Sequence, residues 1–160
     1  MKKELDRIDL KIISALQTDG RMTNVDLADK VGISAPPCLR RVRALEKAGY
    51  LTGYHADVDT AKLGFTVTVF AMVGLHSQAD KDLQAFEGLV RSWPEVRECH
   101  MLNGDIDFIL KCISEDLSSF QLFLTQKLTP APNVANVKTS LTIRQTKKHP
   151  GVPLYNLSTA

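Results

Sequence analysis

Four basic side chains stand close together in the first third of the chain, and their spacing suits binding to nucleic acid. They are Arg40, Arg41, Arg43 and Lys47. At about 100° per residue, Arg40, Arg43 and Lys47 fall on one side of a helix. Arg41 falls on a flank. Arginine offers paired, planar donors that match both phosphates and the O6/N7 edge of guanine. Taken alone, a solvated basic surface explains the same face equally well, since runs of charge are usually solvated.

Residues 22–47 predict the two helices that would present this basic face to DNA. Thr23 is placed to cap the first helix, with Asp26 at the capping-box position three residues later. Gly32 follows the last residue of the apolar stripe, where helices commonly end with a positive φ that glycine adopts without a steric penalty. Ser34 is placed to cap the second helix. Two capped helices joined by a tight turn are typical of a helix-turn-helix, whose second helix lies in the major groove.

The predicted DNA-binding residues lie on these two helices and at their starts. Pro36 and Pro37 fall in the first turn of the second helix, where a missing N–H removes no intrahelical hydrogen bond. Together with the capped helix and the glycine turn, the basic face favours DNA binding over a merely solvated surface. The full predicted set is Thr23, Asn24, Ser34, Pro36, Pro37, Arg40, Arg41, Arg43 and Lys47.

An upstream helix completes a small DNA-binding domain over residues 1–53. Asp6 and Asp9 stand at capping-box spacing at the start of an apolar stripe that ends near Asp19. Three helices of this length make a domain of the size that minimal DNA-binding domains have. The glycines and tyrosines that follow the last helix break it, and we expect a short strand or wing there. A linker is predicted over residues 54–64.

The apolar pattern changes period at residue 65 and predicts a second domain over residues 65–146. Residues 65–75 alternate as a long strand whose two faces both carry large apolar groups. Asn103-Gly104-Asp105 favours a hairpin between two later strands. The predicted elements are a strand over 65–75, a helix capped by Asp80 and stopped after Trp93, strands over 96–102 and 107–113, a helix over 117–128 and a strand over 137–143.

The order of these elements predicts both a fold class and an oligomer. The order β-α-β-β-α-β is that of the ferredoxin-like split βαβ fold, an antiparallel sheet with both helices on one face. We therefore expect an α+β protein with a three-helix, winged helix-turn-helix domain followed by a ferredoxin-like domain. The open face of the sheet would leave Phe70 and Met72 in water unless it is covered. A second copy of the sheet is the simplest cover, and it would supply the two-fold symmetry that palindromic DNA requires.

Four segments resemble the Lrp/AsnC family of bacterial and archaeal transcription regulators. They are LDRIDLKI at 5–12, DGRMTN at 19–24, PCLRRVRALE at 37–46 and ECHMLNGDIDFILK at 98–111. These segments anchor both predicted domains, and the leucine-responsive branch is the most similar. The resemblance implies a DNA-binding regulator whose dimers assemble into octamers or other higher oligomers. It also implies a small effector, commonly an amino acid, bound between subunits near the hairpin.

The hairpin has chemistry that fits such an effector. Gly104 would let a ligand approach backbone N–H groups, which can hold a carboxylate. Asp105 or Asp107 could meet an ammonium group. From the residues alone, the better explanation of this segment is a plain turn with no ligand, in which Asp107 is a solvated strand end. The family resemblance reverses that preference in favour of an effector site. The predicted effector-binding residues are Leu102, Asn103, Gly104, Asp105, Ile106, Asp107 and Phe108.

Composition narrows the remaining classes of function. The net charge is only +2, so basicity is local to the predicted recognition helix. The three cysteines (38, 99 and 112) lack metal-ligand spacing and the four histidines are scattered, so we expect no metal and no cofactor. The odd cysteine number favours reduced thiols in the cytosol, where a nucleoid-associated protein would act. No signal peptide or apolar run of membrane-spanning length is present, so no membrane partner is expected.

Two other functions fit parts of the sequence. Haem-pathway decarboxylases resemble the same two-domain organisation, and His100 would be their catalytic histidine. No paired carboxylates and no nucleophile–base set support an enzyme, so we do not expect one. An abundant, weakly specific DNA-wrapping protein would differ from a regulator in the ratio of specific to non-specific affinity.

Residues 147–160 form the last predicted segment. Pro150, Gly151 and Pro153 interrupt it, and it shows little periodicity. We expect a poorly ordered tail or an arm that contacts a neighbouring subunit.

Overall fold

Two compact units make up the chain in a computed structural model, which describes residues 4–154. The first unit contains the residues up to Asp57 together with those from Lys147 onward. The second unit runs from Val58 to Thr146. The chain therefore passes from the first unit to the second and back again.

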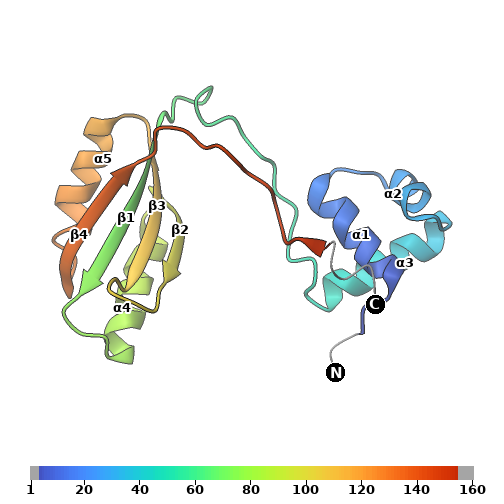
Figure 1. Cartoon of the computed structure of the whole chain (residues 1–160), viewed down its shortest axis with the longest axis horizontal. Helices are drawn as coiled ribbons and strands as arrows, with labels where there is room; N and C mark the ends of the chain where they lie inside the picture. The colour runs from blue at the N-terminus through green and yellow to red at the C-terminus, as the bar shows by residue number, and fades with distance from the viewer. Residues whose placement is uncertain (1–3, 155–160) are drawn as a thin grey trace. The chain divides into compact units, whose positions relative to one another are not determined.

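Three helices form the first unit, as the sequence predicts (Figure 1). Helix α1 spans Arg7–Thr18, α2 spans Asn24–Val31 and α3 spans Ala35–Lys47. Their apolar faces meet in a single core, and each large side chain buried there contributes roughly 1.5–3 kcal/mol of transfer free energy. The larger members of this core are Ile12, Leu16, Leu27, Val31, Cys38 and Leu45.

Local capping signals set where these helices begin and end. Asp6 accepts a hydrogen bond from the Asp9 N–H at 2.8 Å, and Asp9 accepts one from the Asp6 N–H at 3.5 Å, which completes the predicted capping box. Thr23 caps α2 by accepting from the Asp26 N–H at 3.2 Å. Gly32 ends α2 with a φ of +80°, in the left-handed conformation that the sequence predicted.

The strand expected after α3 does not form in the described chain. Residues 48–54 are turns and irregular chain. The Tyr54 hydroxyl donates to Glu46 Oε1 at 2.9 Å, which folds this segment back onto the last turn of α3. Burial and the neighbouring Glu46 raise the pKa of Tyr54 to about 12, so the hydroxyl remains a donor. In place of strand pairing, the N–H groups of Tyr50 and Leu51 donate to the Leu45 carbonyl at 3.0 and 3.4 Å, which keeps the chain after α3 in a turn.

Arg41 holds α3 against the N-terminal end of α1. Its Nη1 atom lies 2.6 Å from Asp6 Oδ2 and 2.9 Å from Asp9 Oδ1. The side chain of Asp9 is only 1% exposed, whereas that of Asp6 is 52% exposed. A buried carboxylate is costly unless a cation and hydrogen bonds compensate it. This ion pair therefore fixes the rotation of α3 about its own axis.

The same contacts shift the titration of Asp6 and Arg41. The hydrogen bond from the Asp9 N–H and the Arg41 guanidinium hold the pKa of Asp6 below its ordinary value of 3.8. The two carboxylates raise the pKa of Arg41. A carboxyl whose pKa is lowered by folding stabilises the folded state above its unfolded pKa, and that contribution is lost as the pH falls through the folded pKa. The contribution of Asp6 is therefore present above about pH 4 and declines below it.

A four-stranded antiparallel sheet with strand order β2–β3–β1–β4 forms the second unit. Helices α4 and α5 lie on one face of this sheet (Figure 1). The arrangement confirms the predicted ferredoxin-like fold. In chain order the elements are β1 Val67–Leu75, α4 Asp80–Ser92, β2 Val96–Met101, β3 Phe108–Ser114, α5 Leu117–Phe123 with a following π-helical turn Leu124–Leu128, and β4 Val134–Leu141.

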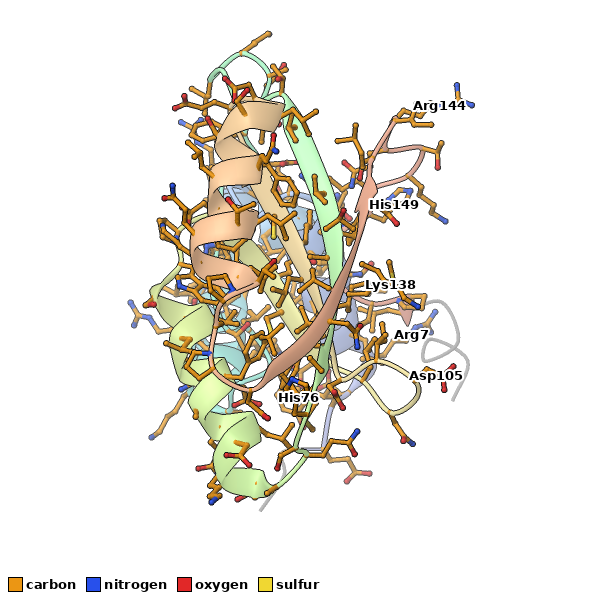
Figure 2. All side chains as sticks on the ribbon, turned by 90° about the vertical axis from the view of Figure 1, so that its left-hand side faces the viewer. Arg7, His76, Asp105, Lys138, Arg144 and His149 are labelled. Atoms are coloured by element: carbon orange, nitrogen blue, oxygen red, sulfur yellow. The ribbon has the colours of Figure 1, made fainter. Side chains whose placement is uncertain are left out.

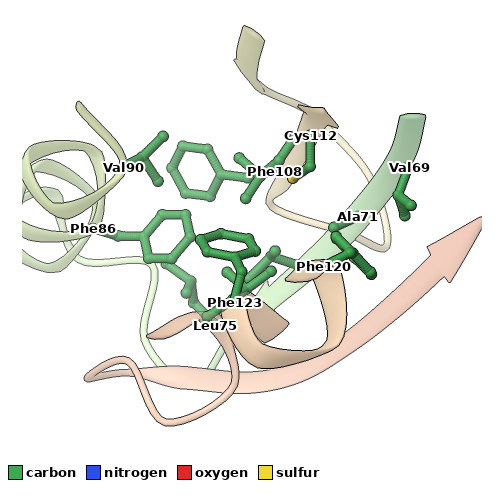
Figure 3. Packing of buried hydrophobic residues seen from close by; sticks show 12 residues of the cluster. Val69, Ala71, Leu75, Phe86, Val90, Phe108, Cys112, Phe120 and Phe123 are labelled. Carbon is green, nitrogen blue, oxygen red and sulfur yellow. The ribbon is translucent and has the colours of Figure 1, made fainter. Parts of the chain in front are cut away.

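Aromatic side chains fill the core between the sheet and its two helices (Figure 3). Phe86 on α4 packs against Phe108 on β3, with ring centroids 4.9 Å apart. Trp93 meets Phe123 edge to face at 5.5 Å. Burial raises the pKa of Cys112 to about 12, so this thiol is a protonated packing group.

Several boundaries in this unit differ from the sequence prediction, most clearly at the start of α4 and at both ends of the last strand, which begins at Val134 and not at 137. Asp80 does not cap α4; it is the first helical residue, and Ala79 is the N-cap. No side chain caps α4; the Ser77 hydroxyl accepts from the Ala79 N–H at 3.3 Å and donates to Asp82 Oδ2 at 2.6 Å, which links the segment before α4 to its first turn. The last strand ends at Leu141, which pairs with Val69 of β1, and Ile143, the predicted last residue of that strand, is 98% exposed.

We predict that Arg41→Gln destabilises the first unit by about 1–3 kcal/mol, because it removes a charged hydrogen-bond donor to the buried carboxylate of Asp9. Asp6→Asn should cost less than about 1 kcal/mol, since that pair is exposed and asparagine also caps helices. Urea unfolding followed by circular dichroism measures both changes. Arg43→Gln is the matched control because Arg43 is exposed and forms no ion pair within residues 4–154. Equal stability of Arg41→Gln and Arg43→Gln would contradict the structural role of Arg41.

Candidate functional site

Helix α3 presents three exposed cations on its outer side. Arg40, Arg43 and Lys47 are all exposed, and none of them forms a salt bridge with another described residue. Arg41 is different, because its guanidinium is committed to Asp6 and Asp9. Of the four basic residues that the sequence singled out, the structure therefore leaves three available for an external anion.

The start of α3 carries a hydroxyl group that the helix does not use. Ser34 is the N-cap residue, yet its side chain makes no capping hydrogen bond. An N-cap hydroxyl normally accepts from the N–H groups at the second and third helical positions. Here those positions are Pro36 and Pro37, which have no N–H to donate. The exposed Ser34 hydroxyl is therefore free for an external partner, next to the exposed ring of Pro36.

Two of the predicted DNA-binding residues have structural roles inside the first unit. Asn24 Nδ2 donates to the Ala35 carbonyl at 2.9 Å and so joins the start of α2 to the start of α3. Thr23 caps α2 while its hydroxyl donates to the Asp26 carboxylate at 2.6 Å. Thr23 stays exposed, whereas Asn24 is half-buried. Like Arg41, Asn24 thus links two helices of the first unit, and its predicted contact with DNA stays a prediction.

The β2–β3 hairpin carries the candidate effector-binding residues, and its tip is exposed. Leu102, Asn103, Gly104 and Asp105 are all exposed, and Figure 2 shows Asp105 on the loop that joins the two strands. A Cβ atom built on Gly104 meets no other atom within 4 Å, so the space beside its backbone is open. Ile106 is half-buried below the tip.

The base of the hairpin is buried and has partners of its own. Asp107 is 8% exposed, and its Oδ2 accepts from the Leu75 N–H at 2.6 Å. The Asp107 N–H donates to the Val73 carbonyl at 3.0 Å, and its carbonyl accepts from the Leu102 N–H at 2.8 Å. The alternative of a solvated strand end is therefore wrong for Asp107. Phe108 is fully buried against Phe86, so its ring supports the hairpin from the core side.

The sheet face opposite the helices has an apolar centre with charged residues around it. Phe70 lies there, 37% exposed, between Lys111 on β3 and Ser140 on β4. Met72 lies between Ile109 and Lys138 in the same registers. Figure 2 shows Lys138 on the side of the sheet away from the helices. We call this surface, defined by Phe70, Met72, Ile109, Lys111 and Lys138, the open sheet face.

His100 lies on the same face, at the edge strand β2. It is exposed, and its Nε2 lies 3.7 Å from Glu98 Oε2, while Glu98 accepts from Lys111 Nζ at 2.6 Å. Lys111 lowers the pKa of Glu98, so this carboxylate is ionised and paired. Within residues 4–154, no group of three His, Cys, Asp or Glu side chains is placed to hold a metal ion. None of the helices described is long and apolar enough to cross a membrane.

Two family models match the chain one after the other. The model described as winged helix-turn-helix DNA-binding matches residues 5–52. The model described as the Lrp/AsnC ligand binding domain matches residues 68–152, more than half of the chain. The first match lies within the helical unit, and the second covers most of the sheet unit and continues to residue 152, in the segment that returns to the first unit.

Several regulators are similar to nearly the whole chain. The leucine-responsive regulatory protein of Rhizobium meliloti is 54% identical over 147 residues, which cover 92% of this chain and 94% of that protein. The Bkd operon transcriptional regulator of Pseudomonas aeruginosa is 42% identical over 151 residues, covering 94% and 99%. A solved transcriptional regulator of Neisseria meningitidis, in complex with L-Met, has a TM-score of 0.91 at 33% identity and covers 96% of this chain and 99% of that one.

The geometry and the comparisons agree on what each unit is. The first unit is a DNA-binding helix-turn-helix, and the second is a ferredoxin-like ligand-binding domain. The resemblance first seen in four short segments extends over most of the chain. This chain belongs to the Lrp/AsnC family of transcriptional regulators.

Proposed function

We propose that this regulator reads DNA with the outer side of α3. Arg40 and Arg43 would contact base edges or phosphates in the major groove, and Lys47 would contact a phosphate farther along the helix. Ser34 and Pro36 would lie near the groove at the start of α3. The observation that carries this proposal is the difference among neighbouring arginines: Arg41 is bound inside the unit, while Arg40 and Arg43 are exposed and form no ion pair with another described residue.

We predict that Arg40→Ala and Arg43→Ala each weaken operator binding by about 1–3 kcal/mol, roughly 5- to 150-fold, because each removes a charged, bidentate donor. Footprinting on a native promoter, or titration of a duplex selected by the protein from a random pool, measures the loss. Arg91→Ala, which removes an exposed arginine of α4, is the control for net charge. Unchanged affinity in both α3 variants, with the fold intact, would refute the assignment.

A second pair of variants separates DNA contact from helix capping. Ser34→Ala should weaken DNA binding with little effect on stability, because the Ser34 side chain caps nothing. Thr23→Ala should instead lower stability by about 1 kcal/mol, because Thr23 does cap its helix. If Ser34→Ala lowered stability and left DNA binding unchanged, the proposed contact at the start of α3 would be wrong.

The regulator is further proposed to be at least a dimer, formed through the open sheet face. Phe70, Met72 and Ile109 place apolar groups at the centre of the sheet face opposite α4 and α5. A two-fold contact between two such faces would bury these groups. It would also give the pair of DNA-reading helices the symmetry of a palindromic site.

We predict that Phe70→Lys shifts the protein toward monomer, because the new charge would be buried without a partner at the centre of the interface. Multi-angle light scattering measures the mass. The control is Leu117→Lys, at a similarly exposed leucine on α5, which should leave the assembly unchanged. A monodisperse wild-type monomer would contradict the dimer.

An amino acid is the proposed effector, bound at the β2–β3 hairpin. Three observations support this: relatives are named leucine-responsive, one similar structure holds L-Met, and the hairpin offers open backbone beside an exposed carboxylate. Backbone N–H groups near Gly104 would hold the ligand carboxylate, and Asp105 would meet its ammonium group. Leu102 and Ile106 would contact the ligand side chain. Asp107 and Phe108 would position the hairpin from below.

We predict that Gly104→Val abolishes effector binding, because a branched side chain would occupy the open space beside the backbone. Asp105→Ala should weaken binding through loss of the ammonium partner. A thermal-shift screen of the common amino acids identifies the effector, since a ligand of the folded state raises Tm. Calorimetry then compares the variants. Gln121→Ala, at an exposed position of α5, is the control. Unchanged affinity in Gly104→Val would place the site elsewhere.

The proposed response is a change in DNA affinity or assembly on binding the effector. By linkage, an effector that prefers one assembly state is itself bound more tightly by that state. A coupling of about 1–3 kcal/mol, typical of such systems, would change DNA affinity roughly 5- to 150-fold. Gel shifts with and without the effector measure this change.

A further inference from the structure

The chain returns to the helix-turn-helix unit after the last strand, and one side chain holds it there. Gln17 on α1 makes two hydrogen bonds with the backbone of Val152. Gln17 Nε2 donates to the Val152 carbonyl at 2.8 Å, and the Val152 N–H donates to Gln17 Oε1 at 3.2 Å. We call this paired contact the clasp. It gives residues 147–154 a defined place in the first unit, where the sequence predicts a poorly ordered tail or an arm on a neighbouring subunit. Residues 155–160 of that predicted tail lie outside the described residues.

The residues around Val152 are suited to this contact. Gly151 has a φ of +70°, and a Cβ atom built there would overlap the Gln17 amide. Pro150 and Pro153 flank the pair, and their fixed φ angles reduce the conformational entropy lost when the segment docks. An ion pair between Lys148 and Asp57 holds the same segment a few residues earlier.

The clasp makes the sheet unit a segment that is connected to the first unit at both of its ends. The first connection, residues 58–66, contains no helix or strand and is almost entirely exposed. The second connection follows β4 and ends in the docked residues 147–154. One exposed connection alone would behave as a flexible linker, whereas a second fixed connection closes a loop and removes much of that freedom.

We propose that the clasp is a second tether that restricts reorientation of the helix-turn-helix unit, and thereby strengthens simultaneous binding to two half-sites. The inference rests on the proposed dimer. Once one half-site is bound, the second contact depends on the effective concentration of the other helix-turn-helix unit. That concentration falls with roughly the 3/2 power of linker length, so releasing one tether lowers it without altering α3.

The test compares Gln17→Ala and Gly151→Val with the wild-type protein, each as the full chain. The DNA is a duplex selected by the wild-type protein from a random pool, in its full form and cut to a single half-site. We expect both variants to bind the full duplex about threefold more weakly if release doubles the effective linker length. Binding to the single half-site should not change. Ser14→Ala is the control, one turn away on the same side of α1, because its side chain makes no hydrogen bond within residues 4–154.

Amide hydrogen exchange at Val152 shows directly whether the clasp is present, because that N–H is one of its donors. Slow exchange in the wild-type protein and fast exchange in both variants is expected. Three results would overturn the proposal. The Val152 amide could exchange equally fast in the wild-type protein and in both variants. Alternatively, the variants could show fast exchange at Val152 and yet bind the full duplex as tightly as the wild-type protein, or more tightly. If the wild-type protein binds one and two half-sites equally well, the proposed dimer fails and the tether role fails with it. If the wild-type protein prefers two half-sites and both variants keep that preference, the proposed role of the clasp as a tether is wrong, while the proposed dimer stands.

Discussion

The buried carboxylate of Asp9 is the constraint on which the DNA-binding unit depends. It lies at the first turn of α1, and Arg41 reaches it from α3. Because successive residues of a helix are 100° apart, turning Arg41 inward places Arg40 and Arg43 on the outer side, about 60° from each other. This ion pair thus contributes to the stability of the unit and sets the direction in which the neighbouring arginines point. Asp6 and Asp9 form the capping box of α1 as well, so the same two side chains start one helix and orient another.

The sheet unit is organised around β1, which contributes to the open sheet face, anchors the β2–β3 hairpin and pairs with β4. Its outward residue Phe70 lies at the centre of the open sheet face. Its last residue, Leu75, donates to Asp107 and so anchors the base of the effector hairpin. β1 also pairs with β4, and the chain after β4 leads to the residues that dock on α1. A ligand that displaced the hairpin would therefore act on the same strand that carries the proposed dimer contact, which gives the proposed coupling a physical basis.

Much of this structure could be predicted because it depends on signals between residues only three or four positions apart, which can be recognised in the sequence itself. The capping pairs at Asp6 and Thr23, the turn at Gly32 and the alternation of β1 all lie within such a range, and each appears as expected. The helix-turn-helix and the βαββαβ order follow from them.

The exceptions involve partners that are distant in the sequence or side chains whose local partner is missing. Arg41 lies 32 residues from Asp9, and nothing near either residue indicates that they meet. The clasp joins Gln17 to Val152 across 135 residues. Ser34 has the residue type and the position of an N-cap, yet its hydroxyl makes no capping hydrogen bond. The sequence signal for this is the pair of prolines at positions 36 and 37, because proline has no N–H to donate to the cap. Asp107 was a candidate ligand group by type, while its burial depends on the packing of β1.

One experiment can test whether Arg41 is bound inside the unit while Arg40 and Arg43 contact DNA. NMR spectra of isotope-labelled arginine side chains would be recorded for the protein alone and with its selected duplex. In the free protein we predict slow exchange and a rigid signal for Arg41, and fast exchange for Arg40 and Arg43. On adding DNA, the signals of Arg40 and Arg43 should shift and become protected, while that of Arg41 stays in place. A mobile Arg41 in the free protein, or a DNA-induced shift confined to Arg41, would contradict the account.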